Sequence, residues 1–355
     1  MNNKVLVKLE NVSKKFGNVS VIKNINLDIY EGEFLTLLGP SGCGKTTILR
    51  IISGLEDASS GKVYIDDVDV TNVDATKREV NTIFQNFALF PKMTVYENVS
   101  FGLRMQKVSE EEIKTRVNKV IKLVKLEGFE NRYPKELSGG QQQRVAIARG
   151  IVMNPKVLLL DESLCSLDLK LKKNMQVELK RIQKKLGLTF IYVTHAQDEA
   201  LSMSDRIAII NKGVIEQLGT PSEIYIEPKT VFVADFIGEA NIVDGTIIKQ
   251  KDNDVTLSIL NDFRVDIKTN ELFTKDERVK VIIRPEDVKV SPNSLTNSIT
   301  GEITDFIYGG DTTKLIIKID ENNSLKTSVT DEERYKTGDK VYIKFEEKYI
   351  VALRK

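Results

Sequence analysis

The stretch GPSGCGKT, from Gly39 to Thr46, constrains the fold of this chain more than any other feature. It follows the apolar run EFLTLL and precedes KTTILRIISGL, whose apolar spacing is that of a helix. Glycines in such a strand–loop–helix unit let backbone N–H groups face an anion, and the helix N-terminus adds partial positive charge. The spacing predicts a nucleotide phosphate site, in which Lys45 bridges the β and γ phosphates and the Thr46 hydroxyl binds Mg²⁺. The alternative is a glycine-rich turn with a chance lysine, and the flanking elements argue against it.

Four runs are short and apolar on both faces, as in strands buried within a mostly parallel sheet. They are EFLTLLG (33–39), KVLLLDE (156–162), LTFIYVTH (188–195) and RIAIINKG (206–213). Between the first two lies a more helical block, where Ser109 and Glu112 have the spacing of a capping box. Strands that alternate with helices predict an α/β domain.

Polar residues follow the predicted strands. Asp161 and Glu162 end one run, and His195, the only histidine, ends the next. Asp161 suits Mg²⁺, directly or through water, Glu162 is placed to polarise an attacking water, and His195 to reach a γ-phosphate. Gln85, in NTIFQNFALFPKMTV, is suited to contact Mg²⁺ or the water and to report nucleotide state to the aromatic loop after it. Taken alone, each of these residues is more often structural, and the phosphate loop makes the functional interpretation the stronger one.

A second turn suited to an anion occurs in LSGGQQQR, at residues 137–144. Ser138, Gly139 and Gly140 precede QQQRVAIARGIV, whose apolar spacing is helical. The free N–H groups at that helix start have no phosphate of their own. Two such turns indicate either two ligands in one subunit or one composite site across two subunits.

Composition favours a folded protein of two domains. The chain has 355 residues, of which 41% are hydrophobic and 29% charged, and a formal net charge of +1. The near-neutral charge gives no general attraction to nucleic acid. No apolar run approaches the length of a membrane span, and MNNKVLVKLE lacks the apolar core of a signal peptide, so we expect a cytoplasmic chain. Cys43 and Cys165 are the only cysteines and are expected to be reduced thiols without a metal.

The composition changes after about residue 236. The short alternating runs DGTIIKQ, DVTLSIL, RVKVIIR, GEITDFI, TKLIIKI and KVYIKFE are separated by Gly, Asn and Asp. This pattern predicts a separate all-β domain of small barrels over 236–355.

With these motifs in order, residues 1–235 resemble the ATPases of the ATP-binding cassette (ABC) family. The motifs that carry the resemblance are the phosphate loop, Gln85, LSGGQ, Asp161–Glu162, Ser166–Leu167–Asp168 and His195. The resemblance implies a P-loop core with an inserted helical subdomain at about 87–153, followed by an OB-like (TOBE) regulatory domain. It also implies that LSGGQ closes over the γ-phosphate bound to a second copy, so that the two anion sites form one composite site in a homodimer.

The resemblance implies a full set of site residues. Those that contact ATP are Phe16, Gly39, Pro40, Ser41, Gly42, Cys43, Gly44, Lys45, Thr46, Thr47, Ser138, Gly139, Gly140, Gln141 and Asp168. Those that bind Mg²⁺ are Thr46, Gln85 and Asp161, and the catalytic residues are Glu162, His195 and Gln85. Phe16 has the place of the aromatic residue that stacks on adenine.

Within the family, IIRPEDVKV and the β-rich end are similar to importer ATPases that serve two integral membrane permease subunits and an extracellular or periplasmic solute-binding protein. The stretch VADFIGEANIVDG is most similar to the ATP-binding subunits of spermidine/putrescine importers. The resemblance therefore implies a peripheral ATPase at the cytoplasmic face of the membrane that powers polyamine import. Relatives that import maltose, ferric iron, sulfate or glycine betaine share most of the other motifs and remain alternatives.

Two alternatives lie outside transport as the main role. A soluble ABC ATPase acting on nucleic acid or the ribosome usually has two cassettes or long coiled-coil insertions, and neither is visible here. The C-terminal domain is also compatible with a module that senses cargo or a signalling protein, or with a dimerisation scaffold.

Three positions depart from the family pattern. Ser163 replaces a usual Pro, Ala196 a usual Asp, and Gly150 a usual Ala. None removes a ligand to phosphate or metal, so we expect reduced or altered turnover rather than an inactive site.

Overall fold

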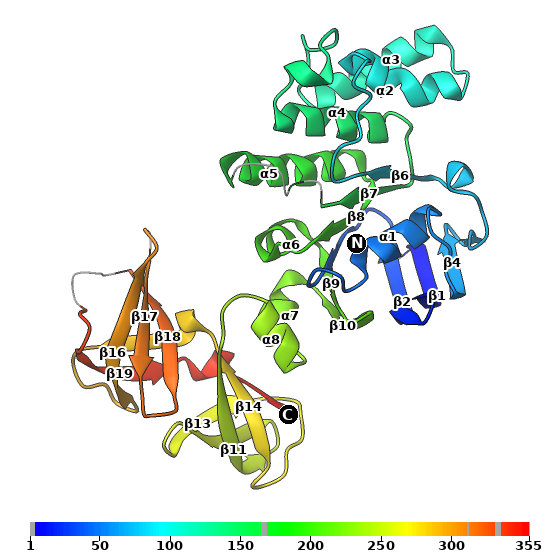
Figure 1. Cartoon of the computed structure of the whole chain (residues 1–355). Helices are drawn as coiled ribbons and strands as arrows, with labels where there is room; N and C mark the ends of the chain where they lie inside the picture. The colour runs from blue at the N-terminus through cyan, green and yellow to red at the C-terminus, as the bar shows by residue number, and fades with distance from the viewer. Residues whose placement is uncertain (1–3, 163, 165–168, 311, 331–334, 355) are drawn as a thin grey trace. The chain divides into compact units, whose positions relative to one another are not determined.

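The computed structural model describes residues 4–162, 164, 169–310, 312–330 and 335–354 (Figure 1). The chain divides into two compact units, Met1–Pro221 and Ser222–Lys355. The predicted boundary between the functional domains, at 235/236, lies a short distance after this division and stays a prediction. None of the helices in the described residues is both long and apolar enough to span a bilayer.

A six-stranded sheet forms the centre of the first unit. Its strands, in spatial order, are β10 (Val214–Gly219), β9 (Arg206–Asn211), β3 (Phe34–Leu38), β8 (Thr189–Thr194), β7 (Val157–Asp161) and β6 (Val80–Ile83). All neighbours are parallel except β9 and β10. The four strands expected from apolar runs are therefore confirmed. Every residue of β3 and β8 is buried, which explains why these strands lack polar alternation.

Two hydrophobic cores cover the two faces of this sheet. Because side chains alternate along a strand, Phe190 and Tyr192 of β8 enter one core and Ile191 and Val193 the other. The second core also holds α1 (Lys45–Ser53) and the antiparallel sheet of β2 (Val19–Tyr30), β1 (Val5–Phe16), β4 (Ser60–Ile65) and β5 (Val68–Asp69). The first core holds α5 (Leu169–Leu186) and the helices that follow β6.

Those helices are α2 (Val95–Met105), α3 (Glu110–Leu123) and α4 (Gly139–Ile151) (Figure 1). The Ser109 hydroxyl caps α3 by accepting a hydrogen bond from the Glu112 N–H at 3.3 Å, which is one half of the expected capping box. The Glu112 carboxylate pairs with Arg116 instead. The buried stripe of α3 is Ile113, Val117, Val120 and Ile121. The inserted helical block is thus present between β6 and β7.

The second unit is mostly β, as predicted. One five-stranded sheet comprises β13 (Phe263–Lys268), β12 (Asp254–Ile259), β11 (Asn241–Lys251), β14 (Arg278–Ile283) and β20 (Val351–Arg354). The other comprises β15 (Val288–Ser291), β19 (Lys340–Phe345), β16 (Ile299–Tyr308), β17 (Thr313–Lys318) and β18 (Ser324–Val329). Residues of both sheets share one hydrophobic core, and the helices α7 (Pro221–Ile226) and α8 (Val231–Phe236) precede them in the chain.

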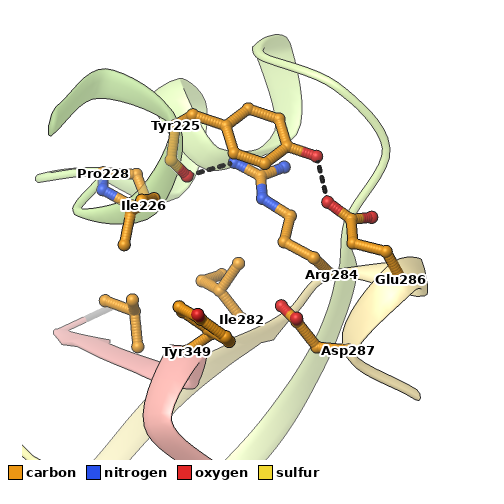
Figure 2. Close-up of a pocket in the computed structure, with 9 residues that line it drawn as sticks. Tyr225, Ile226, Pro228, Ile282, Arg284, Glu286, Asp287 and Tyr349 are labelled. Carbon is orange, nitrogen blue, oxygen red and sulfur yellow. Dashed lines mark hydrogen bonds between the residues drawn. The ribbon is translucent and has the colours of Figure 1, made fainter. Parts of the chain in front are cut away.

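Arg284 ties these helices to the β-sheets. Arg284 is 4% exposed, and its guanidinium donates hydrogen bonds to the carbonyls of Ala234, Ile237 and Glu239 at 3.0, 2.7 and 3.1 Å. It also donates to the Tyr225 carbonyl at 3.1 Å and lies 4.4 Å from the centroid of the Tyr225 ring (Figure 2). Five N–H donors in one plane allow a single residue to satisfy several carbonyls at the ends of two helices.

Replacing Arg284 by lysine is expected to destabilise this unit by about 3 kcal/mol, because one ammonium cannot reach all four carbonyls and leaves buried acceptors unpaired. Hydrogen exchange of the α8 amides and denaturant unfolding measure the effect. The matched control is Arg354→Lys, since Arg354 is exposed and pairs with Glu271 and Glu277 at the surface. An equal loss of unfolding free energy in the two variants would contradict the role of Arg284.

A cavity of about 240 Å³ lies beside Arg284, within the second unit (Figure 2). Its walls include Tyr225, Ile282 and Tyr349, together with the carboxylate residues Glu286 and Asp287. The Tyr225 hydroxyl donates a hydrogen bond to the Glu286 carboxylate. Burial, with the neighbouring charges of Glu286 and Glu346, raises the pKa of Asp287 to about 6.

The raised pKa of Asp287 predicts a pH-dependent stability. Because the folded chain holds this proton more tightly than the unfolded chain, whose pKa is near 3.8, stability falls as the pH rises from about 4 to about 6. Asp287→Asn imitates the protonated acid and should remove this fall. Its gain in unfolding free energy over the unmodified chain is therefore expected to grow across that window and stay constant above it, whereas a gain independent of pH would contradict the assignment.

Candidate active site

The phosphate loop connects the end of β3 to the start of α1. Gly42 and Gly44 have φ angles of 75° and 109°, which side-chain-bearing residues rarely adopt. A Cβ at Gly39 would lie 2.1 Å from the backbone oxygen of Ile210, so this position has no room for a side chain. The local backbone thus requires the glycines that the motif supplies.

Lys45, the first residue of α1, is 5% exposed and folds back over the loop. Its ammonium donates hydrogen bonds to the carbonyls of Gly39 at 2.7 Å and Pro40 at 2.8 Å. The Cys43 thiol lies 3.8 Å from the same ammonium, and burial raises the pKa of that thiol. The cation is therefore held at the loop, where a phosphate would be bound, and Cys43 remains a thiol rather than a thiolate.

The Thr46 hydroxyl donates a hydrogen bond to the Asp161 carboxylate at 3.1 Å. Burial raises the pKa of Asp161, because the charged carboxylate is partly removed from water. A cation beside the carboxylate would offset this cost. In the part of the chain that the structure describes, no three His, Cys, Asp or Glu side chains gather into a cage for a metal ion. One carboxylate and one hydroxyl fit Mg²⁺, which binds few protein oxygens and completes its shell with phosphate oxygens and water.

Glu162 lies at the centre of the predicted catalytic group. One of its carboxylate oxygens is 3.2 Å from His195 Nδ1, and the other accepts a hydrogen bond from Gln85 Nε2 at 3.4 Å. Its backbone φ is 43°, an unfavourable value for a residue with a side chain, and its N–H donates to the Val193 carbonyl at 3.0 Å. The three residues expected to be catalytic are therefore brought together.

Arg149 is a residue of this region that the sequence analysis missed. It lies in the last turn of α4 and donates hydrogen bonds to the carbonyls of Phe87 and Ala88 at 2.9 and 2.8 Å. Both carbonyls belong to the loop after Gln85, where Phe87 and Ala88 have φ angles of 59° and 44°. No motif distinguishes Arg149, yet it links the Gln85 loop to the helix that begins at LSGGQ.

The LSGGQ turn starts α4 with a capping box. Ser138 Oγ accepts a hydrogen bond from the Gln141 N–H at 3.4 Å, and the Gln141 side chain accepts one from the Ser138 N–H at 2.9 Å. Gly140 is buried, and a Cβ there would lie 2.9 Å from the Leu171 side chain. Ser138 and Gly139 are exposed. Because α4 packs in one core and α1 in the other, the helix of this turn and the helix of the phosphate loop cover opposite faces of the sheet.

The remaining predicted positions are less closely tied to this group. Phe16 ends β1 with 47% of its surface exposed, and the Lys14 ammonium lies 4.9 Å from its ring centroid. Ser41, in the phosphate loop, is exposed, and Thr47, in α1, is half-buried. The predicted contact Asp168 and the departure at Ser163 lie outside the described residues.

The other two departures have a visible setting. Ala196 is the N-cap residue of α6 (Gln197–Met203) and provides no side-chain hydrogen bond there, whereas an aspartate is a good cap. A Cβ at Gly150 would lie 2.9 Å from the flexible end of Leu158.

Comparison with known proteins agrees with this architecture. Residues 22–165 match the family model described as ABC transporter, and residues 281–353 match the TOBE domain. The spermidine/putrescine import ATP-binding protein PotA of Aggregatibacter actinomycetemcomitans is 51% identical over 325 residues, covering 91% of this chain and 87% of that protein. The PotA protein of Haemophilus ducreyi is 48% identical over 363 residues, covering 99% and 98%.

Two solved structures of ATP-binding cassette proteins are also similar to this chain. A dimeric ATP-binding cassette in a post-hydrolysis state, bound to ADP and Pi, is 37% identical, with a TM-score of 0.55 over 61% of this chain and 99% of that chain. The cbiO1 protein of Clostridium perfringens, part of an ABC transporter complex, is 31% identical, with a TM-score of 0.59 over 63% and 92%. The chain therefore belongs to the family of ABC transporter ATP-binding subunits, in the group of the spermidine/putrescine import ATP-binding proteins.

Proposed function

We propose that this ATPase powers the import of polyamines, working as a homodimer with two membrane permease subunits and a solute-binding protein. The group formed by Glu162, His195 and Gln85 at the edge of the sheet supports ATP hydrolysis, which is the first part of this proposal. The PotA relatives support spermidine and putrescine as cargo, because they match nearly the whole chain, including the C-terminal domain. The same relatives favour polyamines over sugar, iron, sulfate or glycine betaine.

In the proposed mechanism, the backbone N–H groups of Gly42 and Gly44 and the Lys45 ammonium bind the ATP phosphates, and Phe16 stacks on adenine. Thr46 and Asp161 would hold Mg²⁺, which would neutralise charge on the phosphate oxygens. Glu162 accepts a proton from the attacking water, while His195 and Gln85 orient Glu162 and the γ-phosphate. Two contacts of Glu162 support these roles: Gln85 Nε2 donates a hydrogen bond to one carboxylate oxygen, and His195 Nδ1 lies 3.2 Å from the other.

The second copy supplies Ser138, Gly139 and Gly140. Because α1 and α4 cover opposite faces of the sheet, the turn before α4 is more readily used by another subunit than by its own phosphate loop. Hydrolysis is then limited to the closed dimer. The Gln85 loop, which Arg149 holds by two hydrogen bonds, transmits the closing and reopening of the dimer to the permease subunits at the cytoplasmic face of the membrane.

Replacing Glu162 by Gln should keep ATP binding and slow hydrolysis by about 10² to 10⁴-fold, because the amide is similar in shape but cannot accept the proton. The variant is also expected to accumulate as an ATP-bound dimer, which light scattering with Mg·ATP measures. Glu127→Gln, at an exposed position of the helical block, is the matched control. Rapid turnover by the Glu162 variant would contradict its role as the base.

The cargo is tested by ATPase activity of the chain reconstituted with its permease subunits and binding protein. Binding protein loaded with spermidine or putrescine should stimulate hydrolysis, and binding protein loaded with maltose or glycine betaine should not. Stimulation by a different solute would retain the transport motor and reject polyamines. A chain that joins no membrane partner and is not stimulated would instead support a soluble ATPase.

A further inference from the structure

The backbone on both sides of His195 is held by one hydroxyl group. Thr194, the last residue of β8, donates a hydrogen bond from Oγ1 to the Glu199 carboxylate at 2.6 Å. The same Oγ1 accepts a hydrogen bond from the Ala196 N–H at 3.0 Å. Residues 194 and 196 are thus connected to each other and to α6, with His195 between them.

Glu199 provides a rigid anchor for this hydroxyl. Its side chain is 0% exposed, and the Tyr192 hydroxyl donates to the same carboxylate oxygen as Thr194. Its other oxygen lies 2.8 Å from the Lys172 ammonium of α5. A buried carboxylate with two hydroxyl donors and a cation has little freedom to move.

His195, by contrast, is weakly held by its own packing. Its side chain is 51% exposed, and its Nδ1 is 3.2 Å from a Glu162 oxygen. The direction of the ring therefore depends on the backbone that carries it. The Ala196 N–H donates to the Thr194 hydroxyl, which fixes the peptide unit that follows the histidine. Ala196, the N-cap residue of α6, adds no side-chain hydrogen bond of its own.

We propose that Thr194, anchored by Glu199, is a positioning residue that directs His195 toward Glu162 and the γ-phosphate. This inference rests on the proposed function, because it adds a residue to the same site. Thr194 is fully buried, so its hydroxyl offers no surface to a bound nucleotide. It acts only through the peptide units on either side of the histidine.

The test compares two identical substitutions on one strand. Thr194→Val removes both hydrogen bonds with almost no change in shape. Thr189→Val, at the opposite end of β8, also removes a hydrogen bond of a buried hydroxyl, which accepts from the Gly32 N–H at 2.9 Å. We expect Thr194→Val to lower kcat about tenfold or more, with the KM for ATP within about twofold of the unmodified chain. Thr189→Val should leave both unchanged, and Thr194→Ser, which keeps the hydroxyl, should restore kcat.

A second measurement does not depend on activity. His195 is the only histidine of the chain, so NMR of histidine-labelled protein reports on its ring alone. Thr194→Val should shift or broaden the ring signals, and Thr189→Val should not. Ring signals that stay unchanged in Thr194→Val would overturn the inference, whether or not kcat falls. Shifted signals in a chain whose unmodified form does not hydrolyse ATP in the assembled complex would support the positioning role and reject the proposed function.

Discussion

The parallel pairing of β3, β8 and β7 is the constraint on which the site depends. In this pairing Leu38 is level with Thr194, and Asp161 with Val193. The residues that follow these strand ends therefore emerge at one edge of the sheet, where Gly39 begins the phosphate loop. A shift of one residue in either pairing would turn every buried side chain of the strand to the opposite core, so the two cores hold the register.

Charge and strain are concentrated at the same edge. Lys45 is buried, Asp161 is half-buried, and Glu162 has a left-handed backbone. These features cost free energy in the folded state, and the all-apolar strands around them offset that cost. Stability alone would favour an exposed carboxylate and an unstrained turn at these positions. The binding of phosphate and a cation explains the observed arrangement better.

Much of this could be predicted from the sequence because the relevant patterns are local. The phosphate loop, the buried strands, the carboxylates at a strand end and the alternating runs of the C-terminal domain each occupy a short continuous stretch. The contacts of Arg149, Thr194 and Arg284 could not be predicted in this way. Arg149 and Arg284 bond to backbone carbonyls far away in the chain. The partners of Thr194 are close in the sequence, but neither periodicity nor a motif specifies any of these contacts. The backbone of Glu162 escaped prediction for the same reason, because its strain follows from the sheet around it.

The central claim is that the phosphate loop of one copy and the LSGGQ turn of another form one ATP site. Cross-linking tests it most directly, with Ser41→Cys and Ser138→Cys introduced into a chain that also carries Cys43→Ala and Cys165→Ala. Ser41 and Ser138 are both exposed in the structure. A short bifunctional thiol reagent should join two copies only when Mg·ATP is present. Cross-linking within single copies, or between copies equally well without nucleotide, would contradict the composite site.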